Sequence, residues 1–282
     1  MDDPDEFRDQ ARDKWDEAAQ GWEKRRAAFQ RAMQPVSMWL VERVAPQPGY
    51  TILELAAGPA DTGLLAAELV LPGGKVILTD TSEQMVEVAR RRADELGIRN
   101  VEARQMDAEW MDAETASVDG VICRFGYMLL ADPGAAFQET RRILRPGGRV
   151  TLATWRAFED NPWTATISSA LKELELVEPA PPGEPGPFAF AEPGTIERYL
   201  EDAGFDDIVV QPLDTTFVFA SADEHFEHQR DMSPTLRSVV PRLSPADHTR
   251  LRDVIDVNLE PYLQPDGSVV LPARVWVAAA TA

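Results

Sequence analysis

Cysteine is almost missing from this sequence. Its 282 residues include one cysteine, Cys123, which excludes an internal disulfide framework and a cysteine-based metal cluster. Long apolar runs are also lacking, because no window approaches the ~18 uncharged apolar residues that a membrane-spanning helix requires. The N-terminal stretch MDDPDEFRDQARDKWDE is acidic and polar, without the apolar segment of a secretory signal. We therefore expect a cytoplasmic protein that does not enter a membrane.

Positive charge is scarce as well. The chain carries 28 Lys and Arg against 48 Asp and Glu, which gives a formal net charge of −20. Binding to DNA or RNA relies largely on Lys and Arg side chains that neutralise phosphates. Nucleic acid is therefore not an expected partner, and neither is an anionic membrane surface. The acidity itself needs no explanation beyond solubility.

Histidine occurs only three times, and two of the three lie one helical turn apart, at His225 and His228. A metal site needs at least a third ligand, and none is close in sequence, so we predict no metal. Either histidine could act as a general base towards an acidic hydroxyl group. The more ordinary place for such a pair is a solvated helix face, and the sequence leaves the catalytic group open.

Between residues 46 and 155, short apolar runs alternate with amphipathic segments. Such alternation of strands and helices implies a parallel sheet that is covered on both faces. We therefore predict an α/β fold with a doubly wound, Rossmann-like, mostly parallel sheet and helical cap segments. The predicted strands are 50–56, 75–80, 100–106, 119–125 and 148–155, and the predicted helices are 60–70, 82–97 and 132–144.

The remaining segments are less regular. Trp15, Trp22 and Phe29 recur every seven residues in an amphipathic N-terminal segment, and EPAPPGEPGP (178–187) resembles a linker or a loop. Pro272 indicates a bulge or an edge within the last strand. The expected organisation is a helical cap (1–45), an α/β core (46–155), a cap insertion or linker (156–195), a core helix and strand (196–220), a helical cap insertion (221–265) and a final core strand (266–282).

The loop within TILELAAGPADTG (51–63) follows the first predicted strand, where open parallel sheets bind ligands. A dinucleotide site would need G-x-G-x-x-G, but the three positions are Ala56, Gly58 and Asp61. Asp80 ends the second strand and can accept hydrogen bonds from both ribose hydroxyls, each worth roughly 1.5–3 kcal/mol. Asp107 ends the third strand and can reach an adenine amine. This pattern favours a compact adenosine ligand over a diphosphate.

Five motifs in order resemble the class I S-adenosyl-L-methionine (SAM)-dependent methyltransferases that act on small molecules. The resemblance is to the group of ubiquinone/menaquinone-biosynthesis C-methyltransferases, and it covers about residues 51–155, with a looser match at 200–205. It implies methyl transfer from SAM, which leaves S-adenosyl-L-homocysteine, to an acceptor that the sequence does not identify. The motifs are ILELAAGPA (52–60), DTSEQM (80–85), QMDAEWM (105–111), ASVDGVICRFGYMLLADP (116–133) and RRILRPGGRV (141–150).

The resemblance assigns roles to matched positions. The first loop would line the methionine and ribose side, Asp80 would hold the ribose, and Met85 would pack on adenine. Asp107 would bind the adenine amine, while the Arg124 carbonyl and Phe125 would border the sulfonium. The implied cofactor-binding residues are Glu54, Ala56, Ala57, Gly58, Asp80, Thr81, Met85, Asp107, Ala108, Arg124 and Phe125.

Two departures keep alternatives open. Ala56 and Ala60 stand where the family usually has glycine, which motivates a second hypothesis of a SAM-binding protein without catalysis, with a sensing or scaffolding role. A NAD-dependent oxidoreductase is a third, although the missing glycines weaken it. For the acceptor we expect an aromatic wall from Trp22, Phe29, Phe125 and Tyr127, completed by the helix that bears His225. Whether an oxygen, nitrogen or carbon atom is methylated stays open.

Overall fold

A computed structural model describes residues 4–177 and 184–282, and its short apolar runs form one mostly parallel sheet. The strand order is β3-β2-β1-β4-β5-β7-β6, with β3 through β5 parallel and β7 antiparallel to both of its neighbours. The order reverses direction between β1 and β4, so the switch point lies beside the first loop. The predicted doubly wound α/β fold is thus confirmed. The strands are β1 (Thr51–Leu55), β2 (Lys75–Asp80), β3 (Val101–Gln105), β4 (Val118–Arg124), β5 (Leu144–Trp155), β6 (Asp206–Phe219) and β7 (Val269–Thr281).

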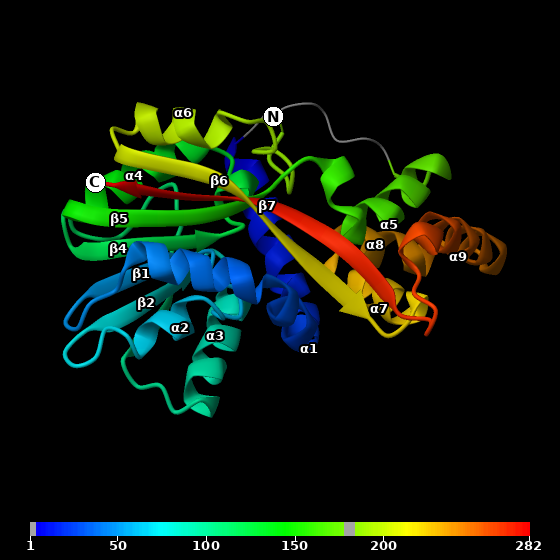
Figure 1. Ribbon diagram of the computed structural model, residues 1–282, viewed down its shortest axis with the longest axis horizontal. Coiled ribbons are helices and arrows are strands. Elements are labelled where there is room, and N and C mark those ends of the chain that lie inside the picture. The colour runs from blue at the N-terminus through cyan, green and yellow to red at the C-terminus, as the bar shows by residue number, and fades with distance from the viewer. Residues whose placement is uncertain (1–3, 178–183) are drawn as a thin grey trace.

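Helices cover both faces of this sheet. In Figure 1, α6 (Thr195–Asp202) lies at the top, with α4 (Pro133–Ile143) between it and β5, whereas α2 (Gly63–Ala67) and α3 (Glu83–Glu95) lie towards the bottom, near β2. Ser82 caps α3 as predicted, because its Oγ accepts a hydrogen bond from the Met85 amide at 3.0 Å. The helix predicted at 60–70 is shorter than expected, since the residues around it form turns.

The long β6–β7 pair carries a second group of helices away from the main sheet. β5 pairs with β7 only as far as Val275, while β6 and β7 continue to Phe219 and Val269. At Pro272, β7 therefore has a neighbour on one side only, which suits a residue without an N–H group. The helices beside this extension are α5 (Pro162–Glu173), α7 (Ala222–Met232), α8 (Pro234–Val239) and α9 (Pro245–Leu259) (Figure 1). The predicted linker 178–187 lies partly outside the described residues.

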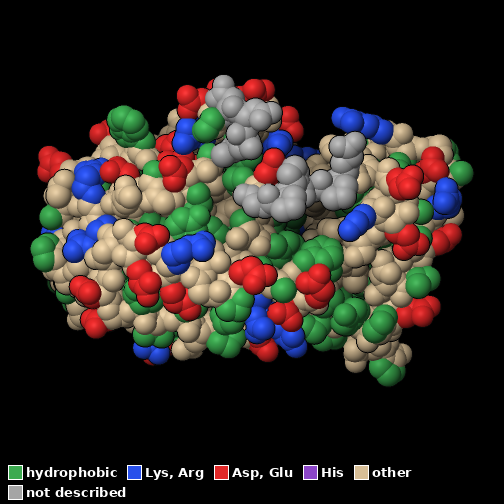
Figure 2. Space-filling model, turned by 90° about the horizontal axis from the view of Figure 1, so that it is seen from above, with side chains coloured by type: hydrophobic (Ala, Val, Ile, Leu, Met, Phe, Trp, Pro, Cys, Tyr) green, Lys and Arg blue, Asp and Glu red, His purple; other side chains and the backbone are tan. Residues whose placement is uncertain are grey.

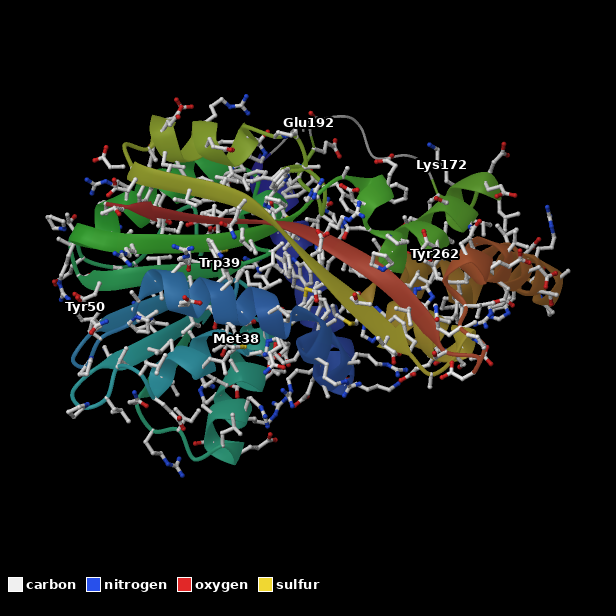
Figure 3. The ribbon with its side chains drawn as sticks, in the orientation of Figure 1. Met38, Trp39, Tyr50, Lys172, Glu192 and Tyr262 are labelled. Atoms are coloured by element: carbon white, nitrogen blue, oxygen red, sulfur yellow. The ribbon has the colours of Figure 1, made fainter. Side chains whose placement is uncertain are left out.

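The N-terminal segment is one helix, α1 (Pro4–Val44), of 41 residues. Its last third belongs to the core, because Met33, Val36 and Leu40 are fully buried against the sheet. Met38 lies on the outer side of the same turn and is 58% exposed (Figure 3). The first half of α1 continues past the sheet towards α3 and α7. The segment is therefore partly core, and not only a cap over it.

The surface offers no gathered positive charge on the face seen in Figure 2, where basic side chains are scattered among acidic ones. No helix in the described ranges 4–177 and 184–282 is long and apolar enough to cross a bilayer.

Close packing at Gly21 fixes α1 against α7. A Cβ atom at Gly21 would lie 2.0 Å from the backbone oxygen of Asp231, so only glycine permits this approach. Lys24 and Arg25 then reach the Asp231 carboxylate at 2.8 and 2.6 Å. The helix crossing thus depends on a residue that lacks a side chain.

We predict that Gly21→Ala destabilises the protein by ~1–3 kcal/mol through overpacking, although alanine favours helix over glycine by about 1 kcal/mol. Chemical denaturation followed by circular dichroism measures the change. The control is Gln20→Ala, at the exposed neighbouring position, which should change stability little. A stabilised Gly21→Ala variant would show that α1 and α7 do not pack this closely.

Candidate functional site

A pocket lies at the carboxyl ends of β1 to β4, under the N-terminal half of α1. Strand ends at a switch point are where open α/β sheets place ligands. Tyr50, which precedes β1, lies at the other end of the strands, where the amino end of β1 begins (Figure 3). The lining residues are Phe7, Arg8, Ala11, Trp15, Trp22, Phe29, Glu54, Leu55, Ala56, Ala57, Gly58, Pro59, Asp80, Thr81, Met85, Met106, Asp107, Ala108, Glu109, Arg124, Phe125, Gly126, Leu129, Leu130 and Ala131.

The first loop keeps a glycine-like backbone at its two alanines. Ala56 and Ala60 have φ values of 49° and 60°, in the left-handed region, and Gly58 has 50°. Such a conformation costs an L residue roughly 1–2 kcal/mol. Gly126 makes room for one added methyl group, because a Cβ there would lie 2.7 Å from the Ala56 Cβ. The two alanines therefore adopt a strained backbone conformation in this loop.

Asp80 ties the loop after β1 to the start of α3. Its Oδ2 accepts from the Gly58 amide at 2.9 Å, and its Oδ1 accepts from the Ser82 amide at 3.0 Å. Burial raises the pKa of Asp80 to about 6, against the effect of these hydrogen bonds. Each carboxylate oxygen keeps a second lone pair, so the group can accept further hydrogen bonds from a ligand in the pocket.

Glu54 is the second buried carboxyl group. Its Oε2 accepts from the Gly63 amide at 2.9 Å, at the start of α2. Burial raises the pKa of Glu54 to about 8, although the charge of Arg124 opposes the shift. Near neutral pH the side chain is therefore largely protonated, and it would ionise readily beside a cationic ligand.

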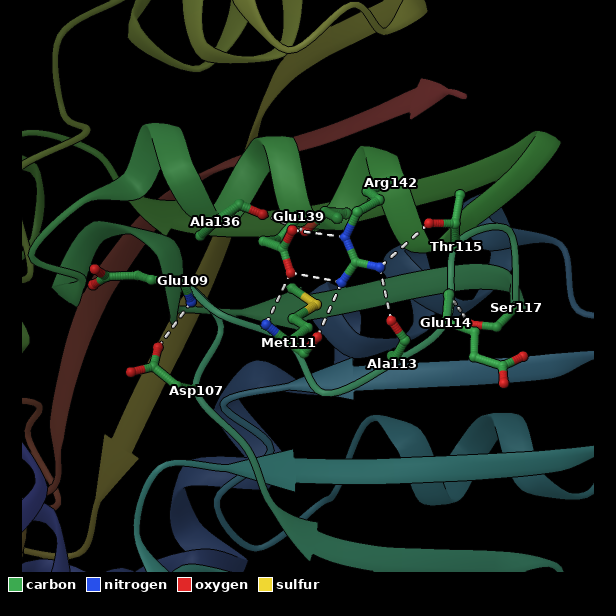
Figure 4. A network of polar contacts seen from close by, with 11 residues as sticks. Asp107, Glu109, Met111, Ala113, Glu114, Thr115, Ser117, Ala136, Glu139 and Arg142 are labelled. Carbon is green, nitrogen blue, oxygen red and sulfur yellow. Dashed lines mark hydrogen bonds and ion pairs between the residues drawn. The ribbon is translucent and has the colours of Figure 1, made fainter.

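The loop after β3 is held in place from α4. Arg142 donates to the backbone oxygens of Ala113 and Met111 at 2.7 and 3.0 Å, and it pairs with Glu139 (Figure 4). Glu139 also accepts from the Met111 amide at 2.9 Å, and hydrogen bonds from Arg142 lower the pKa of Glu139. This network fixes the loop that begins with Asp107 at the pocket.

Within that loop, Asp107 forms a local turn. Its Oδ1 accepts from the Glu109 amide at 2.8 Å (Figure 4). A turn role and a ligand role are compatible here, because Asp107 also lines the pocket and its other oxygen has no protein donor among the described residues.

The N-terminal half of α1 is fastened over this part of the pocket. Arg8 Nε donates to Glu109 Oε2 at 2.9 Å, and the other oxygen of Glu109 accepts from the Ala131 amide at 2.8 Å. Asp16 accepts from the hydroxyl of Ser82, the N-cap residue of α3, at 2.5 Å. The helix therefore covers the Asp80 and Asp107 side of the pocket as well as the aromatic side.

The sevenfold aromatic spacing places a row of rings along one face of α1. Ring centroids lie 5.9 Å apart for Trp15 and Trp22, 5.0 Å for Trp22 and Phe29, and 6.3 Å for Phe29 and Phe125. Phe125 stacks on Trp155 at 4.2 Å. The row forms an apolar wall from the pocket to the core.

The structure brings all eleven predicted cofactor residues to this one pocket, together with Trp22 and Phe29. Tyr127 is not among the lining residues. It is fully buried, shares a hydrogen bond with Thr140 at 2.6 Å and stacks on Phe137 at 4.1 Å. The expectation that Tyr127 contributes to an acceptor wall is therefore wrong, because its ring packs beneath α4.

The histidines also lie away from the pocket, and neither is on a solvated face. His225 Nε2 contacts the Trp163 oxygen at 2.8 Å, whereas both ring nitrogens of His228 lack a partner among the described residues. Aromatic rings surround the pair, with Phe219 centroids 5.1 Å from each. Burial lowers the pKa of both to about 4, so they are neutral core residues and not bases for a pocket ligand.

Sequence reasoning missed several pocket residues. The sevenfold series that contains Trp15, Trp22 and Phe29 extends back to Arg8, and this periodicity could have revealed it. Phe7 and Ala11 also line the pocket, and their helical spacing from Trp15 could have indicated that they share its face of α1. Leu129 and Leu130 come from a short turn after β4 and gave no such signal.

We predict that Glu54→Gln gains stability relative to the unmodified protein as pH rises. The pKa of this glutamate is 4.5 in the unfolded chain and about 8 in the folded protein. Between these two pH values the unfolded glutamate is ionised while the folded one is still protonated, so the free energy of unfolding of the unmodified protein falls as pH rises. Glutamine does not ionise and is free of this loss. The free energy of unfolding of Glu54→Gln should therefore rise relative to that of the unmodified protein by on the order of 2–4 kcal/mol across that range.

Urea denaturation of both proteins without ligand, at several pH values, measures this difference. Glu42→Gln, on the exposed side of α1, controls for the loss of one charge. A difference that stays constant with pH would mean that Glu54 is ionised in the folded protein.

Comparison with known proteins agrees with this geometry. A family model described as methyltransferase domain matches residues 46–204. A ubiquinone/menaquinone biosynthesis C-methyltransferase from Ralstonia pickettii is 28% identical over 183 residues, which covers 61% of this chain and 73% of the relative. The chain spans less than half the length of some other curated relatives. The matched region covers 32% of an uncharacterized transposon protein from Streptomyces fradiae and 42% of a demethylmenaquinone methyltransferase from Clavibacter sepedonicus.

Solved structures share the fold at low sequence identity. A putative methyltransferase from Bacillus halodurans superposes with a TM-score of 0.58 at 19% identity, over 87% of this chain and 97% of the other. The [4+2]-cyclase SpnF superposes with a TM-score of 0.56 at 17% identity, over 89% and 81%. Since the family model covers more than half of the sequence, the chain belongs to the class I methyltransferases, enzymes whose cofactor is S-adenosyl-L-methionine.

Proposed function

We propose that this protein transfers a methyl group from SAM to a small, largely apolar acceptor in the pocket beneath α1. The observation that carries the proposal is the shared location of the eleven motif residues at the ends of four adjacent strands. The donor roles follow the order of the strands. Asp107 and Ala108 would hold adenine, Asp80 the ribose, and the Ala56–Gly58 loop the methionine end.

The bonding state of Asp80 supports the ribose role. Both oxygens already accept one backbone amide each, so the carboxylate is fixed in orientation before a ligand arrives. Two hydroxyl donors on adjacent ribose carbons match its two remaining acceptor positions. A diphosphate would instead meet the carboxyl groups of Asp80 and Glu54 together, which disfavours the NAD alternative.

The acceptor side of the pocket is apolar. Phe7, Trp15, Trp22 and Phe29 from α1 line the pocket together with Leu129 and Leu130 after β4. Aromatic rings of this kind suit a flat or apolar molecule and exclude water. Quinone precursors, which the name of the Ralstonia relative implies, are one such class.

When bound, SAM supplies an electrophilic methyl group on a sulfonium centre. The chain's own contribution is to hold the acceptor atom in line with that methyl group, which accounts for up to ~7–11 kcal/mol of rate enhancement in well-oriented reactions. Phe125, with a φ of 69°, and the Phe29 ring beside it would border the transfer path and keep it dry. No protein nucleophile is required, and His225 and His228 are too far inside the core to accept a proton.

A SAM-binding protein without methyl transfer is the second candidate. The strained alanines at 56 and 60 motivate it, and the cyclase among the structural neighbours illustrates that one fold hosts different chemistry. The decisive assay incubates the protein with methyl-labelled SAM and a panel of phenols, quinols and amines. Label in any acceptor supports the proposal, whereas tight SAM binding without transfer to any acceptor favours the second candidate. A cytoplasmic location is part of the proposal, since such a cofactor is an intracellular metabolite.

We predict that Asp80→Asn weakens binding of both SAM and S-adenosylhomocysteine by tenfold or more. The amide can accept at only one atom and places an NH2 group against a backbone amide, so hydrogen bonds to a charged acceptor are lost. Calorimetric titration of the folded variant measures the affinity. Asp132→Asn is the matched control, because Asp132 caps α4 outside the pocket. Equal affinity for the Asp80 variant would contradict the ribose role.

We further predict that Glu109→Gln speeds dissociation of S-adenosylhomocysteine several-fold. The change removes the negative charge that holds Arg8 and so loosens the cover that α1 provides. Stopped-flow fluorescence of the pocket tryptophans follows dissociation. Glu23→Gln is the control, because it weakens a similar pair with Arg91 on the exposed side of the same helix. Unchanged dissociation in both variants would mean that the Arg8 contact does not retain the ligand.

A further inference from the structure

Arg124 ends β4 and lines the pocket, yet among the described residues its guanidinium group donates hydrogen bonds only to neutral oxygens. Nη1 donates to Gln30 Oε1 at 2.9 Å and to Ser37 Oγ at 2.8 Å, both from α1. The Cζ atom lies 5.5 Å from the centre of the Phe29 ring. No carboxylate in residues 4–177 and 184–282 comes within the 4.0 Å of a salt bridge to Arg124.

Two arginines of α1 differ in this respect: Arg8, which also lines the pocket, and Arg26, which is not among the lining residues. Arg8 pairs with Glu109, and Arg26 pairs with Asp61 at 2.8 Å. Asp61 and Glu54 act on Arg124 from a greater distance, but Asp61 already has its own partner. Glu54, with a pKa of about 8, carries little charge near neutral pH. Arg124 is therefore a partly buried cation without a close counter-ion, an arrangement that is costly unless an anion binds there.

The strand order places this cation at one end of the donor site. Neighbouring strands lie ~4.8 Å apart, so the end of β4 is about 14 Å from the end of β3, with β2 and β1 between them. A ligand with its base at β3 and its ribose at β2 would extend its remaining part across β1 to β4. In SAM, that remaining part ends in an amino-acid group that carries a carboxylate.

We infer that the Arg124 guanidinium binds the carboxylate of the methionyl group of SAM and so fixes the amino-acid end of the donor. The inference rests on the proposed function. It goes beyond the motif-based role of Arg124, which involves only its backbone carbonyl. Gln30 and Ser37 act as positioning residues, because their oxygens orient the guanidinium from α1. A carboxylate or phosphate on the acceptor is the other possible source of the anion.

The test compares two ligands that differ only in the carboxylate, S-adenosylhomocysteine and S-adenosyl-3-thiopropylamine. Calorimetric titration without acceptor, at one pH, gives the affinity of each for the unmodified protein and for Arg124→Met. We expect the unmodified protein to prefer the carboxylate ligand by at least tenfold. In Arg124→Met the affinities for the two ligands should lie within about threefold of each other. The reason is that the hydrogen-bonded pair between the guanidinium and the ligand carboxylate is lost.

Two further variants keep the test decisive. Arg124→Lys retains a cation without the planar guanidinium and should keep part of the preference. Arg8→Met removes a cation at the opposite end of the pocket, so the preference should survive it even if both affinities fall. Thermal unfolding verifies that each variant is folded, and Arg124→Lys stands in if the methionine variant is not.

The outcomes separate the alternatives. Equal affinities in the unmodified protein would overturn the inference, and an effect of Arg124→Met on acceptor KM alone would then assign the anion to the acceptor. A preference that persists in Arg124→Met would also overturn it, since the carboxylate must bind elsewhere. If neither ligand binds the unmodified protein, the proposed function fails, and this assignment fails with it.

Discussion

The carboxylate of Asp80 is the interaction on which the site depends. It sits at the end of β2 and joins the amide of Gly58, in the loop after β1, to the amide of Ser82, at the start of α3. One buried side chain thereby joins two segments that otherwise have only a few backbone hydrogen bonds, such as the bond from the Ala57 amide to the Thr79 oxygen at 2.9 Å. That bridge, together with the backbone hydrogen bonds donated by Ala57 and Ala60, opposes relaxation of the positive φ values of Ala56 and Ala60.

Cover from α1 is the second requirement, because a buried carboxylate must be shielded from water to keep its altered pKa. Asp16 reaches the Ser82 hydroxyl and Arg8 reaches Glu109, so the helix contacts the turn after β2 and the loop after β3, which both border the pocket. The other end of the same helix lies in the core at Leu40. Folding of the core and closure of the pocket are therefore properties of one continuous element.

The sequence was sufficient to predict the sheet and to select eleven residues that line one pocket, because both follow from short-range patterns. Strands of the parallel sheet are apolar runs, and the residues at their ends face one edge by geometry. Tyr127 and His225 were assigned wrongly since sequence distance from the motifs does not reveal which way a ring packs. Arg8 and its partner Glu109 are 101 residues apart, a pairing that no local pattern encodes.

The continuity of α1 has a mechanical consequence. Pro35 interrupts its hydrogen bonding on the exposed side of the buried part of the helix, and proline inside a helix is where bending concentrates. From Pro35 to Arg8 the helix spans ~40 Å at 1.5 Å per residue. A bend of only ~5° at Pro35 would therefore swing Arg8 by ~3.5 Å, enough to separate it from Glu109. The helix acts as a lever whose pivot, Pro35, is an exposed residue between the buried Met33 and Val36, so small changes in the packing of these two neighbours would be amplified at the pocket entrance.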